Sequence, residues 1–438
     1  MADQLPVHPV VAPVVAVPAP TPAPTPAPTA TAANGSFPAQ DAAGQTVAAI
    51  AQAETISAGK HSRELIDRSF PCVIHEIALY DRQIRLWGVQ AQEKIRTANI
   101  LLVSIRALAN EVAKNLVLAG IGSITLADHE VVTEDDLGAQ FFISDADVGK
   151  NRAEAAAPQI RKLNPRVQVN VITKDIRLEQ DVNFYTKFDV IIACDLDFQS
   201  LNNLDTGARV AQKPFYAGGA HGFYGFIFAD LGIHDFVIER ELSNRPTVIG
   251  LETPTRSIIA TATKKENGKN IELVTKRETY TPLLLVNTSP LPPDMQKNKR
   301  KLRKVHPLLT CIRALWHYQR EGYGNLPKHT HEDLQRFTQI ATEKHNELLL
   351  PPETLQADFL RNFIQNLGSE LAPVTAFLGG QLAQDVINVL GQREQPIQNL
   401  MLFDGEESVG PIYAMHPIFA DIPITTIPLA NNAPAMVV

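Results

Sequence analysis

The 438-residue sequence predicts a doubly wound α/β fold, in which helices cover both faces of a mostly parallel sheet. From about Asn99 onward, short apolar runs of strand length alternate with amphipathic segments of helix length. Gly120 and Gly122 mark the turn between the first such helix and the next strand. Because strands joined by helix-length crossovers run parallel, this alternation indicates a mostly parallel sheet.

The elements of this domain follow one another along the chain. Residues 99–105 (NILLVSI) are expected to form a buried strand. Apolar residues then recur at the spacing of a helix: Leu108, Val112, Leu116 and Ala119. The next strand, 123–127, ends at Asp128, and a helix is expected over 152–163. Three further strands are expected at 167–173, 189–194 and 214–220.

The alternation then stops. Residues 236–368 are charged and rich in helix formers, with the clearest helices at 302–317 and 330–349, so we expect an inserted, mainly helical region. A buried helix at 374–390 and a strand at 399–404 return to the sheet. The predicted organisation is a tail at 1–65, the first part of the α/β domain at 66–235, the insertion at 236–368, the return of the domain at 369–415 and an extension at 416–438.

The tail differs in composition from the rest of the chain. Ten of the 31 prolines fall within the first 40 residues, which favours an extended and solvated segment without a core. We therefore expect residues 1–65 to be disordered. Such a segment is either a docking arm for a partner or a dispensable extension.

The overall composition limits the possible functions. With 40 Lys and Arg against 47 Asp and Glu, the chain lacks the basic surface that nucleic-acid binding requires. No run reaches the roughly 18 apolar residues of a membrane span. Cys72, Cys194 and Cys311 share no metal-ligand spacing, so we expect structural cysteines in a reducing compartment and no metal site.

A strand, turn and helix followed by an acidic residue is where α/β proteins bind nucleotides, since backbone N–H groups and the helix N-terminus face the phosphates. The turn needs glycines because a Cβ atom blocks close approach. Here the three glycine positions of G-x-G-x-x-G hold Ser104, Arg106 and Ala109. Asp128 either stands where an acid binds ribose hydroxyls or caps a turn. The sequence predicts a nucleotide-binding architecture with a blocked phosphate site, which argues against a dehydrogenase.

Two arginines precede the first strand. Arg82 and Arg85 lie three residues apart, and on a helix they share nearly the same face. A guanidinium can bind phosphate oxygens through two parallel N–H groups, so an arginine displayed near a partner's nucleotide could stabilise developing charge. The alternative is that both arginines pair with acids inside the domain.

Four segments of the chain resemble the ubiquitin-like-protein activating enzymes. They are 80–88 (YDRQIRLWG), 114–122 (KNLVLAGIG), 149–154 (GKNRAE) and 379–385 (GGQLAQD). The similarity extends from about Tyr80 to Gly410, and within the family it is strongest to the small, Aos-type subunits of SUMO-activating enzymes. It implies a Rossmann-like adenylation domain of the ThiF/MoeB type.

The resemblance also implies a heterodimer in which this chain is the inactive, regulatory half. The large catalytic subunit would bind ATP and magnesium, adenylate SUMO and carry the thioester cysteine, and the complex would pass SUMO to the SUMO-conjugating enzyme. Ala139 replaces a phosphate-contacting arginine of active members, and Arg152 stands at a nucleotide-contacting lysine. The resemblance gives Arg82 the role of reaching across the dimer to the partner's ATP.

Alternatives remain at this point. The chain could serve another modifier such as NEDD8, although its insertion is short for that role. It could be a nicotinamide-dependent oxidoreductase, against which the missing glycines argue, or a scaffold without a catalytic contribution.

We expect Gly379 and Gly380 to allow close packing of their helix on the sheet or on the partner subunit.

One dense basic run, within residues 297–304, remains to be interpreted. It consists of Lys297, Lys299, Arg300, Lys301, Arg303 and Lys304. It is either a nuclear localisation signal or the solvated start of a helix. We therefore expect the protein in the nucleus, and also in the cytoplasm.

Overall fold

The structure is a computed structural model, and it describes residues 71–266 and 268–417. These residues belong to one compact unit. The predicted tail at 1–65 and nearly all of the predicted extension at 416–438 lie outside the described residues. Among the described helices, none has the length and apolar character needed to cross a membrane.

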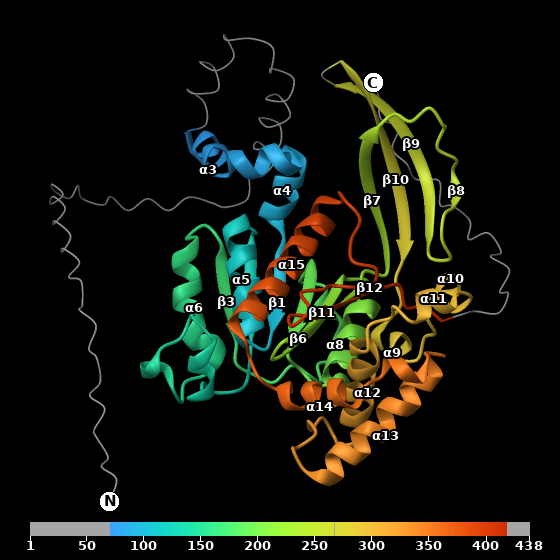
Figure 1. Ribbon diagram of the computed structural model, residues 1–438. Helices are drawn as coiled ribbons and strands as arrows, with labels where there is room; N and C mark the ends of the chain where they lie inside the picture. Colours follow the sequence, from blue (N-terminus) through green and yellow to red (C-terminus); the bar gives the residue numbers. More distant parts are fainter. Residues whose placement is uncertain (1–70, 267, 418–438) are drawn as a thin grey trace, which may run out of the picture. The chain divides into compact units, whose positions relative to one another are not determined.

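An eight-stranded sheet forms the centre of the fold (Figure 1). Its strands are β1 (Asn99–Val103), β2 (Ser123–Ala127), β3 (Gln168–Ile172), β4 (Val190–Cys194), β5 (Phe215–His221), β6 (Tyr224–Asp230), β11 (Leu400–Asp404) and β12 (Ile412–Tyr413). They stand in the order β12-β11-β6-β5-β4-β1-β2-β3. All neighbouring pairs from β5 to β3 are parallel, and the pairs on the other side of β5 are antiparallel. This order confirms the predicted mostly parallel sheet.

Helices cover both faces of this sheet, as predicted. One face carries α4 (Val89–Thr97), α5 (Ala107–Ala119), α6 (Arg152–Leu163) and α15 (Ala372–Gly391). The other carries α7 (Val182–Tyr185), α8 (Phe198–Val210), α12 (Leu308–Glu321), α13 (His331–Glu347) and α14 (Ala357–Asn366). Along β1, Ile100 and Leu102 join the first core, whereas Leu101 and Val103 join the second.

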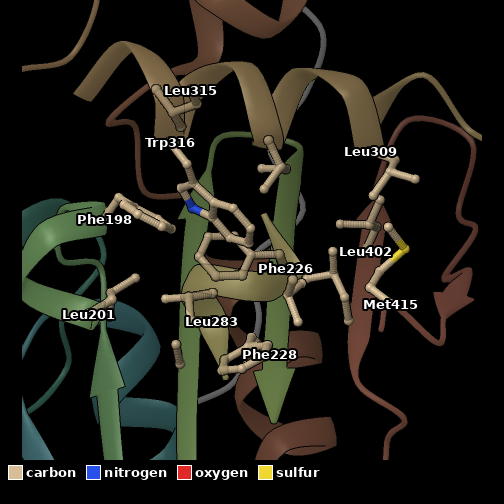
Figure 2. Close-up of a cluster of buried hydrophobic side chains, with 14 of the residues drawn as sticks. Phe198, Leu201, Phe226, Phe228, Leu283, Leu309, Leu315, Trp316, Leu402 and Met415 are labelled. Atoms are coloured by element: carbon tan, nitrogen blue, oxygen red, sulfur yellow. The ribbon is translucent and has the colours of Figure 1, made fainter. Parts of the chain in front are cut away.

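In the second core, the insertion places the ring of Trp316 against the sheet (Figure 2). Trp316 on α12 packs edge-on against Phe226 of β6, with ring centroids 5.3 Å apart, and also lies against Phe198 of α8. Burial of such rings is the main source of stability in a core of this kind. The helical part of the insertion is therefore anchored to the sheet.

The first part of the insertion is not helical, which corrects the prediction for residues 236–279. A second sheet forms there from β7 (Ile233–Glu241), β8 (Gly250–Leu251), β9 (Arg256–Glu266) and β10 (Lys269–Thr279). Its charged residues, which suggested helix, pair across the strands instead. Arg277 lies opposite Asp235 with Nε 2.7 Å from Oδ1, and Arg240 lies opposite Glu272. Such pairs and the β-branched residues of β9 and β10 stabilise the extended form.

The helices of the insertion follow this sheet. They include the short helices α9 (Leu283–Val286), α10 (Pro293–Gln296) and α11 (Lys299–Leu302), and the 3₁₀ turn η3 (Pro352–Thr354). The predicted helix at 302–317 is thus divided between α11 and α12. Pro307 stands at the break, because proline disfavours helical backbone in the residue before it and begins α12 without needing its own N–H bonded.

Two helices lead into the sheet, α3 (Pro71–Trp87) and α4. Tyr80 is buried, and its hydroxyl oxygen accepts a 2.7 Å hydrogen bond from Asn164. Its ring fills the space above Gly120, which has a φ of +81° and where a Cβ atom would lie 2.5 Å from the ring. The indole N–H of Trp87 donates to Gln92 at 2.9 Å. These contacts hold the end of α3 against the domain.

Helix α15 packs directly on α5. A Cβ atom at Gly379 would overlap the Cβ atom of Glu111 and lie 3.2 Å from the backbone nitrogen of Val112. Gly380, the next residue, faces open space. Close packing on the sheet or on the partner subunit was predicted for both glycines. Within the chain the structure requires it only at Gly379, and against helix α5; packing of Gly380 on the partner subunit stays a prediction.

This difference gives a matched test in one helix. We expect Gly379→Ala to destabilise the protein by about 1–3 kcal/mol, because α15 and α5 would have to separate. Gly380→Ala should stabilise it by about 0.5–1 kcal/mol through the better helix propensity of alanine. Urea unfolding followed by circular dichroism measures both. Equal effects of the two substitutions would contradict the close approach.

Candidate functional site

A crevice lies at the carboxyl ends of β1, β2 and β4, and its cavity measures about 200 Å³. Strand β2 lies next to β1 on one side, and β4 lies next to β1 on the other side. The connections therefore run in opposite directions from β1, and a topological switch point lies between β1 and β4. Doubly wound proteins bind nucleotides at this point. Ser104, Arg106, Asp128 and Asp195 line the crevice, so three of the positions singled out in the sequence meet here.

The turn after β1 keeps the shape of a glycine turn without its glycines. Ser104 has a φ of +65°, in the left-handed region that favours glycine. Ala109 is fully buried in the first turn of α5. Asp128 accepts hydrogen bonds from the backbone N–H of Ile105 at 2.7 Å and of Glu130 at 2.9 Å. Each oxygen of Asp128 is therefore used within the chain.

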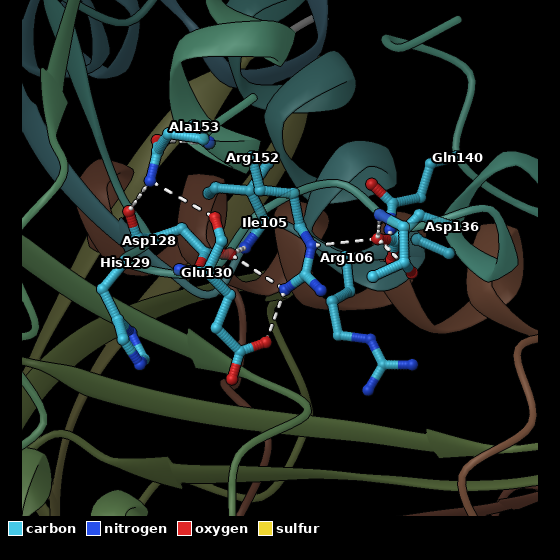
Figure 3. Close-up of polar contacts among 12 residues, drawn as sticks. Ile105, Arg106, Asp128, His129, Glu130, Asp136, Gln140, Arg152 and Ala153 are labelled. Atoms are coloured by element: carbon cyan, nitrogen blue, oxygen red, sulfur yellow. Dashed lines mark hydrogen bonds and ion pairs between the residues drawn. The ribbon is translucent and has the colours of Figure 1, made fainter. Parts of the chain in front are cut away.

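Arg152 begins α6 and points into this network (Figure 3). Its Nη1 lies 3.4 Å from Asp128 and 3.0 Å from Glu130, and its Nε lies 3.3 Å from Asp136. The side chains of Arg152, Asp128 and Asp136 are all less than a tenth exposed. Burial alone would lower the pKa of Arg152, but the three carboxylates raise it above its ordinary value. The guanidinium thus serves as an internal counter-ion.

Arg106 carries the second guanidinium of the crevice. Its Nε lies 3.1 Å from Glu370 Oε1. Burial would lower the pKa of Arg106, but Asp195 and Glu370 raise it. Asp195 follows β4 with a φ of +50°, and one of its oxygens accepts a 2.8 Å hydrogen bond from the N–H of Ala220. Burial raises the pKa of Asp195 to about 7, and Arg106 opposes that shift.

The remaining crevice groups are also paired. Arg177 lies 2.8 Å from Asp175 and 3.0 Å from the ring of His129, and Lys174 lies 3.0 Å from Glu179. These residues follow β2 and β3, so the rule that ligands bind at carboxyl strand ends could have identified them. Glu370 has no such signal, because it comes from a loop more than 260 residues after Arg106 in the sequence.

Ala139 follows the 3₁₀ turn η1 (Asp135–Gly138), which precedes a second such turn, η2 (Asp145–Asp147). The methyl group of Ala139 offers no hydrogen bond to a phosphate. The neighbouring Gln140 donates to Asp136 at 2.6 Å, which extends the internal network. Two acids, Asp195 and Asp197, follow β4. Asp197 caps α8 by accepting from the N–H groups of Gln199 and Ser200.

The residues of the crevice do not fit a bound nucleotide. Both oxygens of Asp128 are used internally, side chains stand at the glycine positions, and the arginines are paired with carboxylates. Among the residues that the structure describes, no cluster of three His, Cys, Asp or Glu side chains could hold a metal ion. Cys194 and Cys311 are buried, which raises the pKa of both thiols; the side chain of Cys72 is not described.

Arg82 lies apart from the crevice on α3 and is exposed. It makes no hydrogen bond or ion pair with any residue in the described part of the chain. Arg85, by contrast, pairs with Asp81 at 2.7 Å. The two arginines that the sequence treated alike therefore differ, since only Arg85 has an internal partner. Leu79 and Leu86, on the same helix, are 60% and 79% exposed.

The network around Arg152 makes a stability prediction. Arg152→Ala should cost about 3–5 kcal/mol of unfolding free energy, because two buried carboxylates lose their counter-ion. The control is Arg177→Ala, which breaks a partly exposed pair at the same crevice and should cost about 1 kcal/mol or less. Chemical unfolding measures both, and a loss for Arg152→Ala no larger than for the control would contradict the network's role.

Comparison with known proteins agrees with this architecture. The model of the ThiF family matches residues 80–416. The chain is 37% identical to the DNA damage tolerance protein RHC31 of Saccharomyces cerevisiae, over 75% of this chain and 94% of that protein. It is 35% identical to SUMO-activating enzyme subunit 1 of Xenopus tropicalis (76% and 94% covered) and 34% identical to that of Homo sapiens (78% and 96% covered). The chain belongs to the ThiF family.

Proposed function

We propose that this chain is the regulatory, non-thioester subunit of a SUMO-activating enzyme. Two relatives named SUMO-activating enzyme subunit 1 align with it over 94% and 96% of their length. A likeness that covers nearly the whole of those proteins supports the same role here. The partner is the larger subunit of the heterodimer, and the substrate is SUMO.

The crevice is the observation that supports ATP binding by the larger subunit and not by this chain. Its acids and bases neutralise one another, and the residues at its turn leave no fit for a nucleotide. A ThiF-family activating enzyme adenylates its substrate with ATP and magnesium, so both are bound by the larger subunit in this proposal. SUMO would be adenylated and carried as a thioester there, and then pass to the SUMO-conjugating enzyme.

Arg82 is the group that this chain contributes to the chemistry. Its guanidinium is exposed and without a partner among the described residues, while Tyr80 and Trp87 fix the helix that carries it. Because the guanidinium fork is planar and preorganised, an arginine loses less freedom per hydrogen bond to phosphate oxygens than a lysine would. Positive charge placed at the leaving pyrophosphate stabilises the transition state of adenylation without any covalent step.

The role of Arg82 is tested in the assembled heterodimer. Arg82→Ala should slow SUMO-dependent exchange of pyrophosphate into ATP by on the order of 10³-fold, by analogy with arginines supplied in trans to other phosphate chemistry. Arg82→Lys should recover only part of the rate, because an ammonium lacks the planar fork. Gel filtration of each variant with the large subunit checks that the dimer still forms.

Arg85→Ala is the matched control, because it removes a guanidinium one turn further along the same helix that is already paired with Asp81. We expect its exchange rate to stay close to that of the unmodified complex. An unchanged rate for Arg82→Ala in an intact dimer would refute the assignment and leave the chain as a scaffold.

We propose a nuclear location for the protein on the basis of residues 297–304. All six basic side chains of this run are exposed, and four of them make no ion pair within the described residues: Lys297, Lys299, Arg300 and Lys304. Unpaired, solvated lysines and arginines are available to an acidic receptor surface. The side chains are accessible to such a receptor, and the same run also begins the short helix α11.

A reporter fusion tests this proposal. Residues 294–307 fused to a cytosolic fluorescent protein should concentrate it in the nucleus. The same segment with the four unpaired basic residues changed to serine should leave the fluorescence evenly distributed. Diffuse fluorescence from the unmodified segment would count against the signal.

A further inference from the structure

The loop before α15 places a carboxylate at the N-terminus of α5. Glu370 Oε1 accepts a 3.1 Å hydrogen bond from the backbone N–H of Ala107, the first residue of that helix. The same oxygen lies 3.1 Å from Nε of Arg106. The side chain of Glu370 is only a tenth exposed, so water competes little for these contacts.

This is the position of an anion. The first N–H groups of a helix have no partner in the helix, and together with the helix dipole they attract negative charge. In nucleotide-binding α/β proteins a phosphate group takes this place. Here a carboxylate oxygen of the chain itself accepts the hydrogen bond of the helix N–H and forms an ion pair with a guanidinium, whose Nε has no hydrogen-bond partner among the described residues.

A second carboxylate accepts from another N–H group of the same turn. Asp128 accepts from Ile105, two residues before Ala107 in the same turn. The turn after β1 thus directs two backbone N–H groups at carboxylates that come from distant parts of the sequence. Side chains at the glycine positions would exclude a phosphate sterically, but they would leave the positive end of the α5 dipole uncompensated. The two carboxylates compensate it.

The loop that carries Glu370 is held in place by backbone contacts. The carbonyl oxygen of Ser369 accepts a 2.8 Å hydrogen bond from Gly222, in the turn between β5 and β6. The carbonyl oxygen of Leu371 accepts from Val374 and Thr375 in the first turn of α15, each at 3.0 Å. Glu370 is therefore positioned from both sides and does not depend on Arg106 for its place.

We propose that Glu370 is an internal anion that occupies the phosphate position at the start of α5 and keeps this crevice from binding polyphosphate. Its removal would free the Ala107 N–H group and leave Asp195 and Asp136 as the acids that still act on the Arg106 guanidinium, so that an external anion could bind there. The ligand class that fits these donors is a diphosphate or longer polyphosphate. This contact adds to the paired acids and the side chains at the glycine positions, and it is independent of the partner subunit and of Arg82.

The test uses the full chain and inorganic pyrophosphate, with binding measured by isothermal titration calorimetry. We expect Glu370→Ala to bind pyrophosphate about tenfold to a hundredfold more tightly than the unmodified chain, the worth of one or two regained charge-assisted hydrogen bonds. Glu370→Gln should show a smaller gain, because the amide fills the same space and still accepts from Ala107 but carries no charge.

Two controls separate the specific effect from a change of net charge. Glu353→Ala removes an exposed carboxylate that pairs with Arg303 at 3.5 Å, and it should leave pyrophosphate binding unchanged. Adding Arg106→Ala to Glu370→Ala should abolish the gain. Circular dichroism establishes that each variant is folded.

Two results would overturn the proposal. One is a folded Glu370→Ala chain that binds pyrophosphate no better than the unmodified chain. The other is an equal gain for Glu353→Ala. If Glu370→Ala does not fold, the Gln variant decides, and the absence of any gain there counts against the proposal. Neither result bears on the Arg82 assignment, which is measured in the heterodimer with an intact Glu370.

Discussion

The buried ion-pair network around Arg152 is the constraint on which the rest of the site depends. It joins the loop after β2 to the start of α6 and to η1, and through Asp128 it reaches the turn after β1. Buried carboxylates are tolerated only when a counter-ion and hydrogen bonds replace water. Asp128, at the position where doubly wound proteins use an acid for ribose, thus holds the chain together here.

Under the proposed function, this arrangement lets one architecture support chemistry on the larger subunit. The sheet, its switch point and the left-handed turn at Ser104 are those of a nucleotide domain. The charged side chains at that point face one another, whereas Arg82 on the anchored entry helix faces solvent. A chain with a neutralised crevice and an outward guanidinium is suited to assist a neighbouring active site.

Much of the fold could be predicted from the sequence, because β1 to β5 and α5, α6 and α15 have clear hydrophobic periodicity. The sheet of β7 to β10 could not, since its charged residues find their partners across strands that are distant in sequence. The same limit applies to the site. Ser104, Arg106 and Asp128 were found from local spacing, but the partner of Arg106 is Glu370, which no local pattern connects to it.

The central claim is that this chain assists adenylation without performing it. The most direct measurement mixes the purified chain, a candidate large subunit, SUMO, ATP and magnesium, and follows SUMO thioester on a non-reducing gel. The account predicts thioester only when both subunits are present, and only on the larger one. Thioester or adenylate formation by this chain alone would contradict it.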